Sequence, residues 1–129
     1  MTPQQKRILL IEDEIYLSDL YAMTLRNGGF IVDVALNGRD GIKLVKNNPD
    51  LIILDVMLPE MNGIDVLKEL KSNDHYKSIP VFMLSNLGQD SIVQEALKIG
   101  ATEYIIKLQI DPYELVKRAT DLLATQPES

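Results

Sequence analysis

Two stretches, ILLIED at residues 8–13 and LIILD at residues 51–55, decide the fold of this chain, because each is a short apolar run that ends in acid. Runs of this kind are typical of strands buried on both faces of a parallel sheet. The binding crevice of such a sheet lies outside the carboxyl ends of its strands. We therefore expect Glu12, Asp13 and Asp55 to meet in one cavity. Crowded carboxylates repel one another, which predicts a bound cation, and oxygen ligands favour Mg²⁺.

The composition is that of one acidic globular domain. The 129 residues fit a single domain, and 46% of them are hydrophobic. The net charge of −6 argues against direct nucleic-acid binding, which needs basic patches. The chain has no cysteine, which excludes disulfides, thiolate metal sites and cysteine nucleophiles. No apolar run approaches the ~20 residues that span a bilayer, so we expect a cytoplasmic protein without a membrane segment.

Strand and helix patterns alternate along the chain. Strands are expected at about residues 7–11, 31–35, 51–55, 80–84 and 103–107, and a helical pattern follows each of them. Gly28 and Gly100 mark the ends of two helices, and Asp111 is the expected N-cap of the last one. This alternation predicts an α/β fold, a parallel sheet with helices on both faces and right-handed crossovers. The strand at 31–35 belongs at an edge, and residues 1–6 and 125–129 are expected to be frayed ends.

Asp55 is the sharpest candidate for chemistry. It closes a predicted strand, and the loop VMLPEMNG follows at residues 56–63. A carboxylate on such a loop can attack phosphorus and form an aspartyl phosphate, although an aspartate here could also be a simple turn residue. Glu12 and Asp13 could cap the first helix, which is compatible with metal binding. A Mg²⁺ ion would take Asp13 and Asp55 directly, Glu12 through a water, and one backbone carbonyl near Met57.

Two further predicted strands end in polar groups. Ser85 ends the fourth and Lys107 ends the fifth. Each alone is typical of an ordinary position, a loop or capping serine and a solvated lysine. Together they bring a hydroxyl and an ammonium to the edge that carries the acids. The ammonium would neutralise a phosphoryl oxygen and, with the metal, stabilise charge in phosphoryl transfer.

Taken together, these residues resemble the receiver domain of two-component response regulators, of the single-domain, chemotaxis-regulator type. The resemblance spans Arg7 to about Leu123, and the joint order of its motifs is specific although each motif alone is weak. The motifs are IEDE at 11–14, LDVMLP at 54–59 with Gly63, Ser85, Gly100-Ala101 with Tyr104, and Lys107. The resemblance implies a flavodoxin-like three-layer sandwich, doubly wound, with five parallel strands in the order 2-1-3-4-5. It also implies a single receiver domain over 1–129, with a core of about 7–123 and no output domain.

The resemblance implies a signalling phosphoacceptor, not an enzyme that turns over a substrate. Asp55 would accept a phosphoryl group, with at most self-catalysed transfer and slow self-dephosphorylation. Glu12, Asp13, Asp55 and the carbonyl of Met57 would bind Mg²⁺. Ser85 and Lys107 would hold the phosphoryl oxygens. Tyr104 would swing inward as Ser85 moves toward the phosphate, a shift between two pre-existing states.

Partners follow from the same resemblance. A sensor histidine kinase or a histidine phosphotransfer protein would exchange the phosphoryl group with Asp55. The face made by the fourth helix, fifth strand and fifth helix would bind a downstream protein or a dimer mate, and both a monomer and a phosphorylation-dependent dimer stay open. The candidate residues on this face, which could equally form a solvated mixed-charge surface, are Ile92, Glu95, Glu103, Lys117 and Arg118.

Two residues depart from the family pattern. Leu108 follows Lys107 where the family usually has proline, often through a cis bond. Without proline a cis bond costs ~3–4 kcal/mol, which favours a trans peptide and a reshaped loop. Asn86 follows Ser85 where the family commonly has a small residue, and it could gate access to Asp55 or hydrogen-bond the phosphoryl group.

Other function classes compete with this interpretation. An aspartyl phosphatase of the haloacid dehalogenase type needs a second acid two residues after its nucleophile, where this chain has Met57. A flavin carrier of similar topology binds phosphate after its first strand, where Glu12, Asp13 and Glu14 would repel it. A degenerate receiver that binds protein without phosphorylation stays open because of Asn86 and Leu108.

Overall fold

The computed structural model describes residues 5–124, in which strands and helices alternate as the sequence predicts. The strands are β1 (Arg7–Ile11), β2 (Ile31–Ala35), β3 (Leu51–Leu54), β4 (Val81–Ser85) and β5 (Glu103–Ile106). The α-helices are α1 (Ile15–Asn27), α2 (Gly38–Leu44), α3 (Gly63–Lys71), α4 (Asp90–Ile99) and α5 (Pro112–Ala124). Two short 3-10 helices are η1 (Val45–Asn47) and η2 (Lys107–Gln109). No helix in the described part of the chain is long and apolar enough to cross a membrane.

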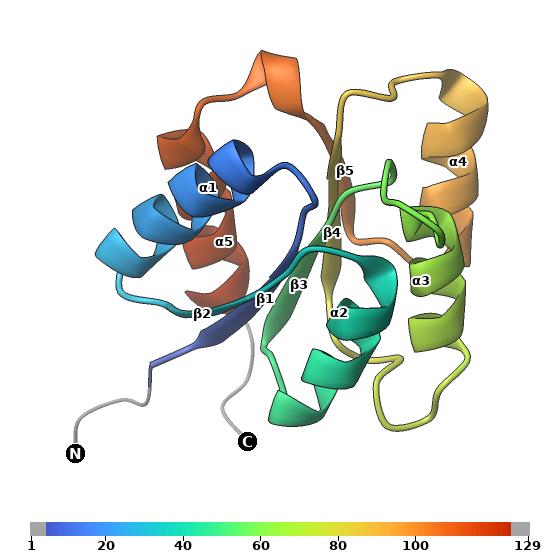
Figure 1. Ribbon diagram of the computed structural model, residues 1–129, viewed down its shortest axis with the longest axis horizontal. Helices are drawn as coiled ribbons and strands as arrows, with labels where there is room; N and C mark the ends of the chain where they lie inside the picture. Colours follow the sequence, from blue (N-terminus) through green and yellow to red (C-terminus); the bar gives the residue numbers. More distant parts are fainter. Residues whose placement is uncertain (1–4, 125–129) are drawn as a thin grey trace.

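The sheet is parallel, with the strand order β2-β1-β3-β4-β5, and this confirms the predicted order and the edge position of β2. Figure 1 shows α1 and α5 on one face of the sheet and α2, α3 and α4 on the other. The result is the doubly wound, flavodoxin-like three-layer sandwich. All five strands therefore end at the same edge of the sheet.

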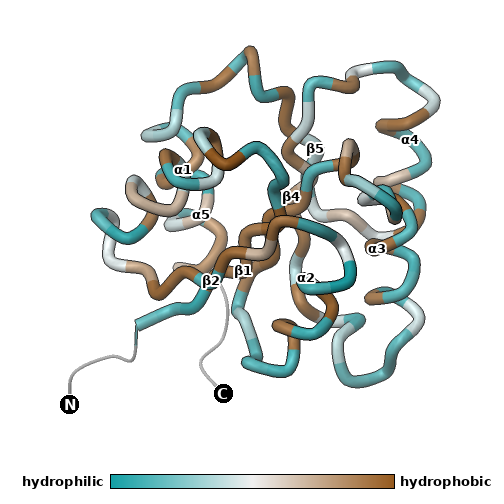
Figure 2. The backbone as a smooth tube through the Cα atoms, in the orientation of Figure 1, coloured by the Kyte–Doolittle hydropathy of each residue, from teal (hydrophilic) through white to brown (hydrophobic). Residues whose placement is uncertain are grey.

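The core forms two layers because alternate residues of each central strand face opposite sides. Ile8 and Leu10 pack with α1 and α5, whereas Leu9 and Ile11 pack with α3 and its neighbours. Both sides are covered, so β1, β3 and β4 need apolar residues at nearly every position. Figure 2 shows these strands as the hydrophobic centre of the molecule. Residues 51–54 are fully buried, which leaves Asp55 as the first polar group of its segment.

Four strand boundaries differ by one residue from the expected ranges, and one of them is the end of β4, at Ser85 in place of residue 84. β3 ends at Leu54, so that Asp55 lies just beyond it, and β5 ends at Ile106 because the chain turns into η2 at Lys107. β4 begins at Val81, because Pro80 has no N–H to donate to a neighbouring strand.

The chain ends were expected to be frayed. Residues 1–4 and 125–129 lie outside the described residues. Within the described part, the Lys6 carbonyl accepts a hydrogen bond from the Ile31 N–H at 3.0 Å, so the segment just before β1 is tied to β2.

A close backbone approach shapes the loop after β3. The Gly63 N–H donates to the Val56 carbonyl at 2.8 Å, and the Asn62 side chain caps α3 by accepting from the Asp65 N–H at 3.0 Å. A Cβ atom on Gly63 would lie 2.0 Å from the Asp55 carbonyl oxygen. Only glycine fits there, and the fit holds the start of α3 against the segment that carries Asp55.

We expect Gly63→Ala to lower the free energy of unfolding by about 3 kcal/mol, because the new methyl group meets backbone atoms that cannot move aside. Gly88→Ala is the matched control, since its Cβ would meet only the Ile106 side chain, at 3.2 Å. Urea denaturation of the three proteins measures the difference. A loss for Gly63→Ala no larger than that for Gly88→Ala would show that the loop is not held by this contact.

Candidate functional site

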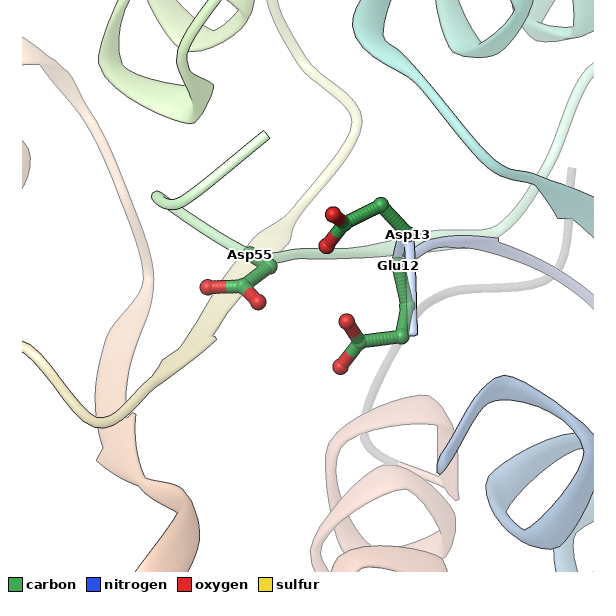
Figure 3. Close-up of side chains that lie close together, drawn as sticks. All are labelled: Glu12, Asp13 and Asp55. Atoms are coloured by element: carbon green, nitrogen blue, oxygen red, sulfur yellow. The ribbon is translucent and has the colours of Figure 1, made fainter. Parts of the chain in front are cut away.

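Three carboxylates gather at the carboxyl edge of the sheet. Glu12 and Asp13 follow β1 and Asp55 follows β3, and each residue offers a carboxylate oxygen that lies within 4.8 Å of the other two. Ile11 and Leu54 are paired in the two strands, and the Asp55 N–H donates to the Ile11 carbonyl at 3.1 Å. Figure 3 shows the carboxyl groups of Glu12 and Asp13 turned toward Asp55. The predicted convergence of the three acids is confirmed.

Lys107 supplies the cation of this cluster. Its Nζ lies 2.7 Å from Asp55 Oδ2 and 2.5 Å from Glu12 Oε1, and its side chain is only 6% exposed. The lysine stands in η2, directly after β5, and its stem spans the edge of the sheet to reach the acids. The solvated alternative for Lys107 is therefore wrong. One ammonium among three carboxylates still leaves an excess of negative charge.

Burial and neighbouring charges shift the pKa values of Lys107 and Glu12. Burial alone would lower the pKa of Lys107, but its hydrogen bonds and charge interactions with Asp55 and Glu12 together raise it. The stabilisation from Lys107 is therefore fully present at neutral pH and is lost only as the pH rises through the raised pKa. Burial raises the pKa of Glu12, although Lys107 opposes the change. Ionised Glu12 therefore costs stability, and this cost falls as the pH drops through its pKa.

Both oxygens of Asp55 are held. Oδ2 accepts from Lys107 and Oδ1 accepts from the Met57 N–H at 3.1 Å. The side chain is buried, so these two contacts fix its orientation. Met57 was predicted through its carbonyl group as a metal ligand. The structure places its N–H on Asp55, and the role of its carbonyl stays a prediction.

The cluster fits a divalent cation. Glu12 Oε2 accepts from the Glu14 N–H at 3.2 Å, whereas the buried Oε1 has the Lys107 ion pair beside it but accepts no hydrogen bond of good geometry. One ammonium cannot neutralise three carboxylates, so a divalent cation would offset the repulsion that remains. Exposed Asp13 gives the cluster a side that faces solvent. Hard oxygen ligands of this kind suit Mg²⁺ or Ca²⁺ better than a soft metal.

Ser85 and Tyr104 lie together on β4 and β5. Ser85 is fully buried and its Oγ accepts from the Leu87 N–H at 3.3 Å, whereas the Tyr104 hydroxyl donates to the Leu87 carbonyl. Burial raises the pKa of Tyr104, and a hydrogen bond with Ser85 lowers it in part. The tyrosine ring is thus turned toward the segment after β4 and is half-buried.

Asn86 and Leu108, the two departures from the family pattern, are joined. Asn86 Oδ1 accepts a hydrogen bond from the Leu108 N–H at 3.0 Å. The described residues contain no cis peptide bond, so the predicted trans peptide between Lys107 and Leu108 is confirmed. The chain forms the η2 turn at this point, and a loop shape that differs from the family stays a prediction.

Comparisons with known proteins agree with this geometry. Residues 8–120 match the family described as the response regulator receiver domain. This chain belongs to that family. The Thermotoga maritima chemotaxis protein CheY is 33% identical over 79% of this chain and 85% of its own length. The structure of the Vibrio cholerae chemotaxis protein CheY4 superimposes with a TM-score of 0.84 at 28% identity, covering 92% of this receiver and 98% of CheY4.

Other relatives are longer. The alkaline phosphatase synthesis transcriptional regulatory protein SphR of Synechococcus elongatus is 37% identical over 91% of this chain but only 48% of its own length. This receiver thus spans about half the length of SphR and of several other transcriptional regulators that it matches.

Some residues of the predicted partner face are already paired within the receiver. Arg118 donates to Glu103 at 2.8 Å and to Glu114 at 3.0 Å, and Lys117 pairs with Asp121 at 3.0 Å. Ile92 and Glu95 instead line a cavity of about 630 Å³ between α3 and α4. Asp13, Met57 and Leu87 also line this cavity, so it opens beside the acidic cluster.

Sequence reasoning missed two backbone groups of the site. The Leu87 peptide unit contacts both Ser85 and Tyr104, and no residue type signals such a role. The Leu108 N–H could have been found, because the absence of the usual proline exposes a donor that needs an acceptor.

We expect Lys107→Met to lower the free energy of unfolding at pH 7 by about 3 kcal/mol, because two buried carboxylates lose their cation. The pKa of Glu12 then rises further, so the folded state takes up a proton more readily than the unfolded state as the pH falls. The loss should therefore be smaller at pH 5 than at pH 7 in urea denaturation.

Lys46→Met is the control, since Lys46 is exposed on η1, and it should change the free energy of unfolding by less than about 0.5 kcal/mol. Equal losses for Lys107→Met at the two pH values would contradict a cost that comes from ionised carboxylates.

Proposed function

We propose that Asp55 accepts a phosphoryl group from a phosphohistidine, carried by a sensor histidine kinase or a histidine phosphotransfer protein. Membership of the receiver family makes this receiver a part of two-component signalling. The observation that carries the assignment to Asp55 is the position of its carboxylate. It lies 2.7 Å from the Lys107 ammonium and next to two further acids at the carboxyl edge of the sheet.

The chemistry follows from the contacts of Asp55. One of its carboxylate oxygens forms a bond to phosphorus while the bond from phosphorus to the donor nitrogen breaks, and the imidazole keeps the electron pair. Lys107 and the Met57 N–H hold the carboxylate in one orientation, which reduces the entropy lost on reaching the transition state. The ammonium also neutralises charge that builds on the phosphoryl oxygens.

Asp13, Asp55 and the Met57 carbonyl would hold Mg²⁺ directly, with Glu12 supporting through a bound water. When bound, the ion supplies positive charge to the phosphoryl oxygens. The excess negative charge that Lys107 leaves on the three carboxylates supports this assignment. Calcium would use the same oxygens, and magnesium is preferred because it keeps several waters and needs few protein ligands.

Phosphorylation would act on the rest of the receiver through Ser85 and Tyr104. A phosphoryl group adds about −1.5 to −2 of charge and three acceptor oxygens near the Ser85 hydroxyl. A hydroxyl drawn toward these oxygens would loosen its contacts with Leu87 and Tyr104. The population then shifts toward a state with a different α4–β5–α5 face.

Output would be phosphorylation-dependent binding of a protein through α4, β5 and α5, either as a monomer or as a phosphorylation-dependent dimer. The Glu103–Arg118 pair joins two elements of this face. The net charge of −6 disfavours a direct contact with nucleic acid. We place this exchange in the cytoplasm. A degenerate receiver is disfavoured, because the acids and the lysine of the site are complete.

We expect a small phosphodonor such as acetyl phosphate, with Mg²⁺, to add one phosphoryl group per chain, as measured by intact mass spectrometry. Asp55→Asn should abolish the addition because the amide is not a nucleophile here. Asp65→Asn, which changes a nearby carboxylate that also lines the cavity, should leave it unchanged. A wild-type protein that stays unmodified, while a known receiver is modified in the same tube, would favour the degenerate module.

We expect Mg²⁺ to raise the melting temperature of the receiver. An ion that binds only the folded state stabilises it by about 2.7 kcal/mol at a hundredfold excess over its Kd. Asp13→Asn should remove most of the gain, because it removes a ligand and lowers the repulsion that attracts the ion. Exposed Asp19→Asn on α1 should keep the gain. An equal rise in all three proteins in thermal denaturation would place the ion elsewhere.

A further inference from the structure

The hydrogen bond from the Leu108 N–H to Asn86 joins two segments that lie 22 residues apart in the sequence. Asn86 follows Ser85, the last residue of β4, and Leu108 follows Lys107, the first residue of η2. In Figure 1 the two connections leave the same edge of the sheet, before α4 and before α5. The bond thus links the two peptide segments that carry the proposed phosphoryl-binding side chains.

This hydrogen bond provides an acceptor for the Leu108 N–H, a donor that is present because residue 108 is not proline. A proline after Lys107 would have no N–H, whereas leucine has one. The first N–H groups of a helical turn have no acceptor within the turn, so Leu108 at the second position of η2 needs an acceptor from outside. The Asn86 side chain supplies it. A smaller residue at position 86, such as alanine, offers no oxygen to this donor.

The bond also continues the pairing of β4 with β5. The last registered pair of these strands is Ser85 with Ile106, and the backbone ladder stops there because η2 begins. Beyond this pair, the hydrogen bond from the Leu108 N–H to the Asn86 side chain takes the place of the next backbone hydrogen bond between the strands. The Leu108 side chain is 85% exposed, so its packing does not hold the turn in place. The hydrogen bond from its N–H to Asn86 is therefore the contact that ties this residue to the sheet edge.

The position of η2 matters because Lys107 stands at its first residue. The lysine must cross from β5 to reach Asp55 Oδ2 and Glu12 Oε1, which follow β3 and β1. A turn free to shift would move the ammonium away from the acids and from a phosphoryl group on Asp55. A misplacement of about 1 Å at such a group has a large effect on rate.

We propose that Asn86 is a positioning residue that holds Lys107 over Asp55 through the Leu108 N–H, in the role that a rigid prolyl peptide would otherwise fill. This inference rests on the proposed phosphoacceptor function. It assigns Asn86 an action through the η2 turn, in place of direct gating or direct contact with the phosphoryl group.

The test compares rates of phosphorylation by acetyl phosphate and Mg²⁺ for the folded proteins. We expect Asn86→Ala to be phosphorylated about fivefold more slowly than the wild type, the size expected from the loss of one hydrogen bond. Asn86→Asp keeps an acceptor oxygen and should restore protection of the Leu108 amide from hydrogen exchange, which Asn86→Ala loses. Adding Asn86→Ala to Leu108→Pro should change the rate no further, because proline has already removed the donor.

Thr102→Val is the matched control. Thr102 Oγ1 accepts from the Val81 N–H at 3.3 Å and so links β4 and β5 at their opposite ends. Its loss should lower stability to a similar extent without changing the rate. Equal slowing by Asn86→Ala and Thr102→Val would show that Asn86 acts only through stability, and would overturn the proposal.

Two further results also decide the matter. In the first, Asn86→Ala slows phosphorylation of the Leu108→Pro protein as much as it slows that of the wild type. This result would show that Asn86 acts directly on the phosphoryl group. It would overturn the positioning role of Asn86 but not the phosphoacceptor function. A wild-type protein that takes up no phosphoryl group would overturn the proposed function, and this inference with it.

Discussion

The ion pairs of Lys107 with Asp55 and Glu12 are the constraint on which the site depends. Two largely buried carboxylates so close together would be costly without a cation between them. The lysine relieves part of this cost and orients Asp55, but it leaves the cluster negative. That residual negative charge favours the binding of a divalent cation. The stability of the fold favours complete neutralisation of these carboxylates, whereas the proposed chemistry needs negative charge that attracts the ion.

The sheet brings these groups together by its topology. β1 and β3 are neighbours, so the acids that follow them meet directly, whereas β5 lies two strands from β3 and needs a long side chain to reach it. Residues 51–54 are fully buried between two helical layers, which fixes the position of Asp55. The Gly63 contact then closes the loop after β3 against the same residue. The buried strands β1 and β3 therefore position the three acids that directly follow them.

The segments after β4 and β5 are joined by hydrogen bonds. Leu87 contacts Ser85 and Tyr104, and Asn86 contacts Leu108. A phosphoryl group that moved Ser85 would therefore disturb β5 and η2 together, at the base of the α4–β5–α5 face. Physical coupling of this kind requires no contact between Asp55 and the distant face.

Local patterns along the chain were enough to predict the alternation of strands and helices, the edge position of β2 and the meeting of Glu12, Asp13 and Asp55. These features follow from local apolar periodicity and from the place where each strand ends. Strand boundaries at Asp55, Pro80 and Lys107 were missed by one residue, because they depend on where backbone pairing between neighbouring strands stops. The burial of Lys107 and the hydrogen bond between Asn86 and Leu108 became visible in the folded chain alone. Such contacts depend on side-chain rotamers and backbone donors from segments 52 and 22 residues apart, which no local pattern encodes.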